Sequence, residues 1–392
     1  MALVSERLGR LPRPPRRKRR AGRGARALLL SARAIPTLRL ISQISMSLLS
    51  LWIGVRFYLF VSGLERNDPD VSLSLRSPGV EAYLPISGLI GLKHWVLTGR
   101  LNGVHPAATL FLLGAIGTGL LLKKGFCGWI CPIGFASENL GTLGMRLLKR
   151  PRPLRVPPVL DYPLRSLKYL LLAFFLWAIL VQMDIGELQA FIEGPYNRVA
   201  DIKMLKFFTE MSSTTAKVLL ALLALSLLVP NFWCRYLCPY GALLGALSRL
   251  SPAKVTRDEK RCINCGLCAK ACPAALPVDK SFRVRSDECN GCLECVAACP
   301  IPRALDVRIG KRRRVHPFLF AALVMIVFFA FPFGGRLARR WEPDISLHEY
   351  RQHVQNLHLP IYQHNRGRPV APAEQGGSAS DYAEQQLLQR PR

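Results

Sequence analysis

Acidic residues are scarce in this chain of 392 residues, which has 25 Asp and Glu against 54 Lys and Arg. A net charge of +29 can indicate a nucleic-acid-binding protein. No helix-turn-helix pattern or basic fold interleaved with aromatic residues accompanies the charge, so we expect no nucleic acid among the partners. The basic residues lie instead between long apolar stretches, and this segregation is typical of a membrane protein.

Several catalytic motifs are also missing. The sequence has no Walker loop, no G-x-G-x-x-G fingerprint and no nucleophile elbow, so nothing in it indicates a nucleotide-binding or acyl-transfer site. The absence of C-x-x-C-H excludes covalent c-type haem. None of the 12 cysteines falls outside four short motifs. These motifs need reduced thiols, so a disulfide scaffold is excluded and the cysteines are expected on the cytoplasmic side. No catalytic residue is identified.

Five apolar stretches are long enough, or nearly so, to cross a hydrocarbon core, which takes ~20 helical residues. They are Ile41–Leu64, Pro106–Leu122, Tyr162–Met183, Ala216–Trp233 and Pro317–Gly334. If the N-terminus is inside, the inner segments hold 37 Lys and Arg and the outer segments hold 16. The positive-inside rule therefore predicts a multi-pass protein with its N-terminus inside and its C-terminus outside.

The strongest motif occurs twice and reads C-x2-C-x2-C-x3-C-P, the bacterial [4Fe–4S] run. Three cysteines of a run wrap one cluster, and the fourth reaches the other cluster. This crossing predicts one ligand set of Cys262, Cys265, Cys268 and Cys299, and a second set of Cys289, Cys292, Cys295 and Cys272. The backbone is expected to pass close to the clusters at Gly266 and Gly291. A pair of zinc sites is the alternative, but zinc does not explain two matching runs that each end in Cys-Pro.

A second motif, C-x3-C-P-x-G, closes the second and fourth apolar stretches. It contains Cys127 and Cys131 in the first copy, and Cys234 and Cys238 in the second. The i, i+4 spacing predicts both sulfurs of a pair on one helix face at the membrane edge. If the two copies pack about a pseudo-two-fold axis, the four thiols converge. They could then hold a third cluster, bind copper or act as redox dithiols, and the alternative is separate cysteines that only pack between helices.

These patterns predict an all-α membrane protein of five transmembrane helices, with a cytoplasmic ferredoxin-like α+β insert. The chain is expected to divide into seven segments. They are a basic arm (1–40), a first hairpin (41–134), a linker (135–161), a second hairpin (162–241), a 2[4Fe–4S] ferredoxin domain (242–315), a fifth helix (317–334) and a partly disordered outer tail (335–392).

A few polar residues could do more. Arg56 lies inside the first span and could snorkel outward or form an ion pair. The segment Leu84–Leu101, with Lys93, His94 and Trp95, is typical of an interfacial helix, and nearby His105 and Glu81 could accept quinol protons. A metal site shared by the tail residues His348, His353, His358 and His364 is not favoured by their spacing.

The ordered set of four cysteine motifs resembles the polyferredoxin-like membrane proteins of anaerobic respiration over residues 36–335. That group includes the membrane quinol-dehydrogenase subunit of the periplasmic nitrate reductase system, the nitrous-oxide reductase regulator and a copper-handling oxidase assembly factor. The chain has only a basic arm where the regulator carries a flavin-binding domain, and its polar tail is too short for the β-sandwich of the assembly factor. It is therefore most similar to the short quinol-dehydrogenase type.

The resemblance implies an electron-transfer subunit of the bacterial inner membrane, a component of a quinol dehydrogenase. Its expected cofactors are two [4Fe–4S] clusters, a third metal or cluster site at the C-x3-C-P pairs, and quinone. The expected partners are membrane lipid, quinone and a redox protein such as a reductase, a cytochrome c or a ferredoxin subunit. Two alternatives remain open, a copper-reducing assembly factor for an oxidase and a redox-sensing regulator.

Overall fold

The computed structural model describes residues 23–149, 154, 156–310, 313–362, 364–365 and 368–369. The expected disordered end of the tail and most of the basic arm lie outside these residues. The chain divides into two compact units. The first unit comprises Met1–Leu48, Gly114–Ala173 and Lys217–Ala330, and the second comprises Leu49–Leu113, Phe174–Ala216 and Phe331–Arg392.

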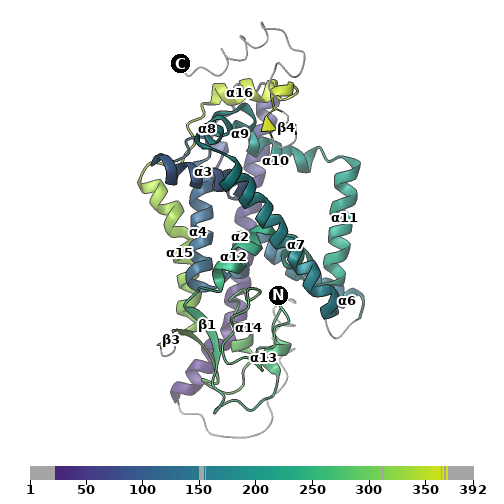
Figure 1. Ribbon diagram of the computed structural model, residues 1–392, viewed down its shortest axis with the longest axis vertical. Coiled ribbons are helices and arrows are strands. Elements are labelled where there is room, and N and C mark those ends of the chain that lie inside the picture. The colour runs from purple at the N-terminus through teal and green to yellow at the C-terminus, as the bar shows by residue number, and fades with distance from the viewer. Residues whose placement is uncertain are drawn as a thin grey trace. The chain divides into compact units, whose positions relative to one another are not determined.

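Five apolar helices run through the chain (Figure 1). They are α2 (Arg23–Glu65), α4 (Pro106–Leu122), α7 (Pro158–Trp177) with the π-helical η3 (Ala178–Gln182), α11 (Ser213–Leu228) and α15 (Pro317–Leu337). Three stretches, Ala32–Glu65, Val159–Gln182 and Pro317–Leu337, are long and apolar enough to cross a membrane, and a bent pair of α10 (Ala200–Thr209) with α11 would make a fourth. Helix α4 is shorter, with 17 residues. The helices therefore fit a membrane protein with three or four evident spans.

Helix α2 begins well before the expected span. The first residue of the helix is Arg23, so the part of the basic arm from Arg23 onward is helical. Ala, Leu and Arg, which dominate this stretch, are strong helix formers, and they extend the helix beyond its apolar part.

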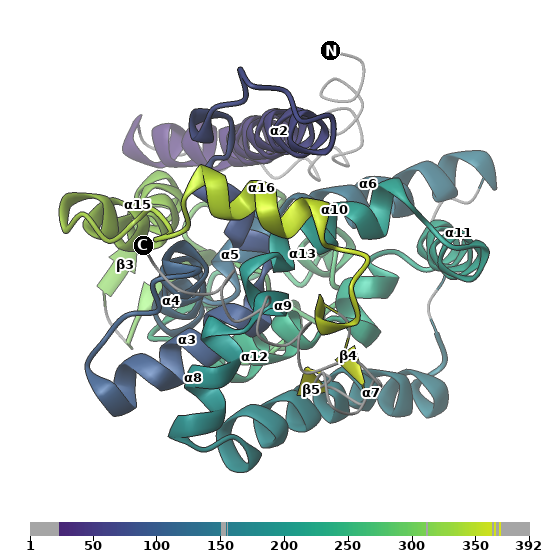
Figure 2. The same cartoon turned by 90° about the horizontal axis from the view of Figure 1, so that it is seen from above.

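The chain passes from one unit to the other within each of the five apolar helices. Helices α2, α7 and α15 begin in the first unit and end in the second, whereas α4 and α11 begin in the second and end in the first. All four cysteine motifs belong to the first unit. Helices α4 and α15 are neighbours in both views of the chain (Figures 1 and 2), and a Cβ at Gly114 would lie 2.6 Å from the Phe328 carbonyl oxygen.

The first unit contains the cysteine motifs on short helices and loops. Its further elements are α5 (Gly125–Trp129), α6 (Pro132–Leu147), the π-helical η4 (Trp233–Leu237), α12 (Pro239–Ser248), α13 (Leu267–Lys270) and α14 (Glu294–Ala297). An antiparallel sheet has the order β1 (Ala253–Arg257), β2 (Leu305–Ile309) and β3 (Arg313–Val315). Ala253 pairs with Ile309 and Arg257 with Leu305, so β1 and β2 join the two ends of the ferredoxin-like insert.

The second unit has its own hydrophobic core around Phe60, Leu188 and Tyr350. Its elements, besides α10, are η1 (Leu73–Leu75), η2 (Pro78–Tyr83), α3 (Pro85–Thr98), α8 (Ile185–Glu193), α9 (Pro195–Arg198), α16 (Leu347–Gln355), η5 (Pro360–Tyr362), β4 (His364–Asn365) and β5 (Arg368–Pro369). Helix α3 coincides with the expected interfacial helix. Its C-terminus is closed by Gly99, whose φ of 72° is a left-handed conformation that suits glycine.

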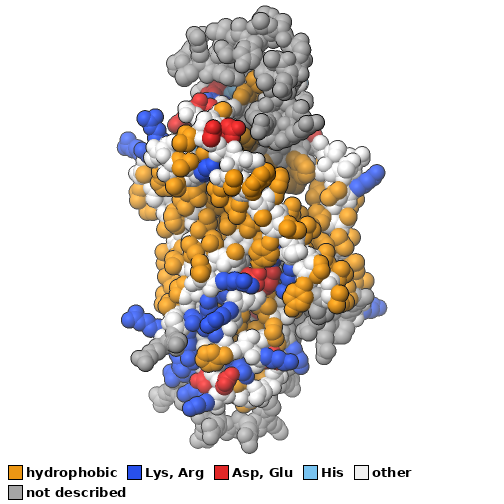
Figure 3. Space-filling model, in the orientation of Figure 1, with side chains coloured by type: hydrophobic (Ala, Val, Ile, Leu, Met, Phe, Trp, Pro, Cys, Tyr) orange, Lys and Arg blue, Asp and Glu red, His pale blue; other side chains and the backbone are white. Residues whose placement is uncertain are grey.

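Large apolar side chains are exposed along the long helices, as Figure 3 shows for one face. Examples are Leu51 and Trp52 on α2, Leu170 and Phe174 on α7, and Leu220 on α11. Apolar surface on this scale needs a cover, which for a membrane protein is lipid.

Candidate functional site

Two small cavities in the first unit are lined by cysteines. We call the cavity with the more exposed cysteines the outer cavity and the one with the more buried cysteines the inner cavity. The outer cavity is lined by Cys262, Cys265, Cys268 and Cys299, and the inner cavity is lined by Cys272, Cys289, Cys292 and Cys295. Each takes three cysteines from one run and one from the other. The grouping is the same as in the crossed ligand sets predicted from the sequence.

The two cysteine loops have the same backbone geometry. In each loop, the residues before and after the second cysteine have positive φ: Asn264 (53°) and Gly266 (69°) in one, Gly291 (61°) and Leu293 (60°) in the other. Left-handed residues turn the chain tightly enough to aim successive sulfurs at one point. Sequence reasoning identified the two glycines, but the structure places a left-handed residue at four positions.

The donor set of each cavity fits a [4Fe–4S] cluster. Four thiols per cavity is the number that a cubane requires. In the described part of the chain, no group of three His, Cys, Asp or Glu side chains that could hold a single metal ion is found.

The C-x3-C-P pairs do not lie on continuous helices, contrary to the prediction. Cys127 lies in α5, whereas Cys131 is the N-cap residue of α6. Likewise Cys234 lies in η4, and Cys238 is the N-cap residue of α12. The following Pro132 and Pro239 disfavour the helical conformation in the preceding cysteine, so a helix ends and a new one starts at each motif.

The two C-x3-C-P motifs pack against each other. The rings of Phe126 and Tyr240 meet edge to face with centroids 5.7 Å apart, and η4 contacts α6. Burial raises the pKa of Cys127 to about 12 and of Cys131 to about 11, and the neighbouring thiols contribute to both rises. Thiols in such a place stay protonated unless a metal binds them, so they are poor dithiol nucleophiles by themselves.

The first C-x3-C-P motif directly contacts the loop Cys289–Cys295, which we call the inner loop. The indole nitrogen of Trp129 donates a hydrogen bond to the Gly291 carbonyl oxygen at 3.0 Å. Gly128 packs so closely that a Cβ there would lie 2.5 Å from the Asn290 carbonyl oxygen. These contacts explain the glycine and the tryptophan between the two cysteines of the motif.

Arg39 of α2 also contacts both the first C-x3-C-P motif and the inner loop. Its Nε donates to the Gly128 carbonyl oxygen at 2.8 Å, and its Nη1 donates to Glu294 at 3.1 Å, next to Cys295. A third partner is Glu138 of α6. Arg39 is only 1% exposed, and a buried cation with two carboxylates is strongly favoured over one without them.

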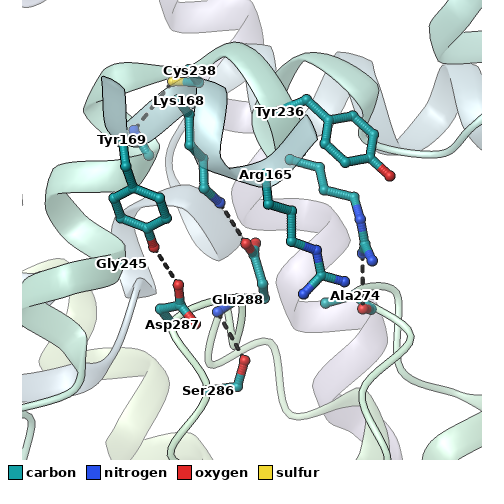
Figure 4. Close-up of polar contacts among 12 residues, drawn as sticks. Arg165, Lys168, Tyr169, Tyr236, Cys238, Gly245, Ala274, Ser286, Asp287 and Glu288 are labelled. Atoms are coloured by element: carbon teal, nitrogen blue, oxygen red, sulfur yellow. Dashed lines mark hydrogen bonds and ion pairs between the residues drawn. The ribbon is translucent and has the colours of Figure 1, made fainter. Parts of the chain in front are cut away.

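Helix α7 anchors the inner loop through two acidic residues (Figure 4). Lys168 pairs with Glu288, and Tyr169 donates a hydrogen bond to Asp287. Lys124 lies 3.6 Å from Glu288 as well. Burial alone would raise the pKa of Glu288, but Lys124 and Lys168 outweigh it and lower that pKa. Glu288 is therefore an ionised anchor directly before Cys289.

The second C-x3-C-P motif contacts the end of the first cysteine run through Arg235. Its Nη1 donates to the Ala274 carbonyl oxygen at 3.2 Å, two residues after Cys272, which lines the inner cavity. Its other donors bind Asp161 at 3.0 Å. Both C-x3-C-P motifs therefore contact the protein around the inner cavity.

Glu81 and His105 lie together in the second unit, as part of a buried ionic cluster. Glu81 Oε1 is 3.4 Å from His105 Nδ1 and 2.9 Å from Arg76, which also binds Asp201 at 2.7 Å. Burial alone would raise the pKa of Glu81, but His105 and Arg76 lower it. Burial would lower the pKa of His105, and the hydrogen bond to Glu81 raises it. Both side chains are fully buried, so neither lines a surface site.

The other singled-out polar residues of the second unit have local roles. Arg56 donates to the Ser74 carbonyl oxygen and lies over the ring of Trp52. Lys93 caps the end of η3 by donating to Ile179 at 3.0 Å. His94 lines a cavity of about 520 Å³, together with Asn102, Gln189, Glu193 and Arg198. Tail residue His353 binds the Tyr362 hydroxyl at 2.6 Å.

Sequence reasoning missed most of the residues that connect the inner loop to α2 and α7. Arg39, Lys168, Tyr169 and Glu288 were not singled out. The available signal was a charge close to or within an apolar stretch, since Arg39 lies just before the expected span Ile41–Leu64 and Lys168 lies inside Tyr162–Met183.

Family models match both kinds of cysteine motif. A model described as a 4Fe-4S dicluster domain matches residues 254–300. A second, described as a 4Fe-4S binding domain, matches twice, at residues 104–151 and 218–257. The double match covers the two C-x3-C-P motifs and agrees with the internal repeat.

Curated relatives are similar to half of the chain or more. The putative electron transport protein YccM of Escherichia coli is 40% identical over 326 residues, which cover 82% of this chain and 90% of the relative. Protein NirI of Paracoccus denitrificans is 30% identical over 61% of this chain and 34% of its own length. The ferredoxin-type protein NapH of Haemophilus influenzae is 27% identical over 50% of this chain and 67% of its own. No solved structure matches. The chain thus belongs to the polyferredoxin-like family of membrane [4Fe–4S] electron-transport proteins.

Proposed function

We propose that this protein carries electrons between the quinone pool, or a cytoplasmic donor, and a respiratory reductase or its maturation system. The observation that carries the proposal is the pair of cavities with crossed cysteine sets. When bound, a [4Fe–4S] cluster supplies reversible one-electron chemistry. The protein holds the thiols, excludes water around Cys292 and Cys295, and fixes the inner loop to α2 and α7.

The proposed ligands are Cys262, Cys265, Cys268 and Cys299 for the outer site, and Cys272, Cys289, Cys292 and Cys295 for the inner site. The outer site is the more accessible, because its four cysteines are partly exposed and Ile263 between them is 47% exposed. It is the natural place for exchange with a soluble partner protein.

The proposed topology has five membrane spans, with the N-terminus and the cysteine motifs on the cytoplasmic side and the C-terminus outside the bacterial inner membrane. Five apolar helices support it, because an odd number of spans puts the two termini on opposite sides. The distribution of Lys and Arg supports the orientation. The 17 residues of α4 would span only about 25 Å at 1.5 Å per residue, which fits a locally thinned bilayer.

Quinone is the proposed membrane partner. The cavity beside His94 in the second unit, about 520 Å³ in volume, has the size of a small-molecule site. The names of the relatives, an electron transport protein and a ferredoxin-type protein, fit an electron carrier.

The test is anaerobic purification in detergent, followed by iron analysis and EPR before and after addition of a quinol. At least about eight irons per chain are expected, as two [4Fe–4S] clusters, with EPR signals that develop on reduction. A chain that binds zinc in place of iron, or whose clusters react neither with quinol nor with any low-potential donor, would contradict the proposal.

A copper-reducing assembly function is the second candidate, because the two C-x3-C-P motifs pack against each other and each carries two free thiols. It predicts stoichiometric Cu(I) binding that depends on Cys127, Cys131, Cys234 and Cys238, with no change in the iron content. Copper titration of the iron-loaded protein distinguishes it from the first proposal.

A further inference from the structure

Basic side chains dominate the exposed surface of the ferredoxin-like insert. Among the described residues between 253 and 315, eight Lys and Arg side chains are exposed, against one exposed acidic side chain, Glu259. The eight are Lys260, Arg261, Lys270, Lys280, Arg285, Arg303, Arg313 and Arg314. Lys and Arg also outnumber Asp and Glu over the insert on the face drawn in Figure 3. An excess of this kind attracts negatively charged partners.

Five of the eight basic residues lie beside the outer cavity. Each of the five is within two residues of one that lines this cavity. They are Lys260, Arg261, Lys270, Lys280 and Arg303, and we call them the basic rim. Arg257, which lines the cavity itself, adds a further cation with its Nη1 atom 3.6 Å from the Cys262 sulfur. The excess of positive charge is therefore concentrated around the proposed outer site.

Acidic side chains near the outer cavity do not cancel this charge. The carboxylate of Glu259 is bound to Arg257 at 3.2 Å, and that of Asp258 lies 3.7 Å from Arg261 and 3.9 Å from Arg308. Within the part of the chain that the structure describes, four members of the basic rim form no ion pair at all. They are Lys260, Lys270, Lys280 and Arg303. These four cations remain available to carboxylates of another molecule.

Proximity to the membrane explains other basic residues but not the basic rim. Arg313 and Arg314 lie in β3, within four residues of Pro317, where α15 begins, and positive charge is usual beside a span. Strand β3 pairs with the end of β2 at Val307–Ile309, whereas the outer cavity is lined by Leu305 at the other end of β2. Four residues of strand separate these ends by about 13 Å. The basic rim is thus a separate group of charges.

An apolar side chain lies within the same region. Ile263 lines the outer cavity in the loop Cys262–Cys268, which we call the outer loop, and it is 47% exposed. All four cysteines of the cavity are also partly exposed. Protein interfaces commonly combine an apolar centre with a polar rim. The outer cavity therefore has the features of a docking surface for a protein of opposite charge.

We infer that the basic rim binds a soluble, acidic one-electron carrier protein whose carboxylates surround its redox centre, with Ile263 at the centre of the contact. The inference rests on the proposed function, and it identifies the soluble partner by its charge. One electron passes from the reduced centre to the oxidised one, and no bond is formed or broken and no proton is transferred. Charge complementarity raises the rate of encounter more than the affinity, which suits a partner that leaves after each exchange.

The first test measures binding without electron transfer. The full chain in detergent is titrated with an oxidised, negatively charged plant-type [2Fe–2S] ferredoxin, and binding is followed by biolayer interferometry. Lys260→Gln combined with Lys270→Gln is expected to weaken binding by about threefold to thirtyfold, because two exposed charge pairs are lost.

The matched control is Arg285→Gln combined with Arg313→Gln. It makes the same change in net charge with two exposed residues, neither of which is within two residues of the outer cavity lining. The control is expected to change the dissociation constant by less than about twofold. Equal weakening by both variants would overturn the inference, because net charge and not the basic rim would then attract the ferredoxin.

The salt dependence of electron transfer gives an answer that requires no variant. Reduction of the iron-loaded wild type by the reduced ferredoxin is expected to slow by about tenfold or more between ~20 and ~300 mM NaCl, as measured by stopped-flow absorbance. Electron transfer from the reduced chain to cytochrome c, which is positively charged, should instead become faster with salt. A ferredoxin rate that does not depend on salt would contradict the inference.

Nanodiscs distinguish a partner protein from a lipid surface. Ferredoxin is expected to bind the chain in nanodiscs of neutral lipid and in nanodiscs that contain anionic lipid. Binding that is abolished only by anionic lipid would show that headgroups cover the basic rim, and would overturn the inference. Clusters that react with quinol in a chain that does not bind the ferredoxin would overturn the inference alone, whereas a chain without iron would overturn the proposed function on which it rests.

Discussion

The inner and outer cysteine cavities are built from the same motif but have different surroundings. The inner loop is bonded to α2, α5 and α7, and Cys292 and Cys295 are buried. The outer loop has partly exposed cysteines, and Arg257 beside it bonds within the insert, to Asn264 at 3.1 Å and to Glu259 at 3.2 Å. The same motif is therefore bonded to the membrane helices in the inner loop and accessible in the outer loop. The residues that surround each loop, and not its cysteines, cause this difference.

This difference also predicts different redox behaviour. Burial and hydrogen bonds around the sulfurs set the potential of an iron–sulfur centre. The inner site, enclosed by paired charges, and the outer site, partly open to water, are therefore expected to titrate separately. Substitutions of Arg39, Glu288, Trp129 and Arg257 test this contrast, with effects on stability that are expected to decrease in that order.

The largest effect is expected from Arg39→Met. Removing a buried cation that serves two carboxylates should cost about 3–5 kcal/mol of stability in the inner region. The inner cluster should then be lost at a lower denaturant concentration than the outer one, as followed by cluster absorbance and EPR. Equal loss of both clusters would show that Arg39 does not distinguish the sites.

Glu288→Gln should weaken the inner loop in a pH-dependent way. The folded pKa of Glu288 is lowered, so its contribution is present above its ordinary pKa of about 4.5 and is lost as the pH falls through the folded value. At neutral pH we expect a loss of about 1.5–3 kcal/mol. The difference in denaturation midpoint between wild type and variant should shrink on acidification below about pH 4.5. A difference that is constant with pH would contradict the ion pair.

Trp129→Phe should have a smaller effect. It removes the indole N–H and leaves the Gly291 carbonyl oxygen without this donor, at a cost of about 1–2 kcal/mol. The EPR line shape of the inner cluster should change, and that of the outer cluster should not. Trp177→Phe is the control, because that side chain is 51% exposed on α7 and should leave both signals as in wild type.

Arg257→Met should have the smallest effect on stability, below about 1 kcal/mol, because its ion pair with Glu259 is exposed on the glutamate side. The Nη1 atom of Arg257 lies 3.6 Å from the Cys262 sulfur, so removing its charge should lower the reduction potential of the outer cluster. A redox titration followed by EPR measures this. An unchanged outer potential with a shifted inner one would reverse the assignment of the two loops.

Spacing within the sequence predicted the two crossed cysteine sets, which stay a prediction, and the same eight cysteines line the two cavities. The contacts that connect the inner loop to α2 and α7 could not be predicted from spacing. Arg39 meets Glu138 and Glu294 across 99 and 255 residues, and nothing local to Arg39 indicates either partner. The C-x3-C-P pairs were misjudged for a related reason: spacing alone suggested one helix face, whereas the proline after each pair ends that helix.

The apolar stretches were predicted close to their observed helices, since hydrophobic length is a direct signal. The start of α2 at Arg23 and the buried cluster of Arg76, Glu81, His105 and Asp201 were not predicted. In the second case the interacting residues come from three separate segments, around residues 76–81, 105 and 201. Their charges look like ordinary surface residues until the fold brings them together.

Crossed cysteine sets have a consequence for biosynthesis. Each cavity borrows one cysteine from the other run, and β1 pairs with β2 across about fifty residues of chain. Neither set is complete when only the first run has left the ribosome, and the insert closes only after Ile309 has been made, just before α15. Metal loading is thus tied to a late stage of translation, and a chain truncated before Cys295 would retain no complete cysteine set in its ferredoxin insert.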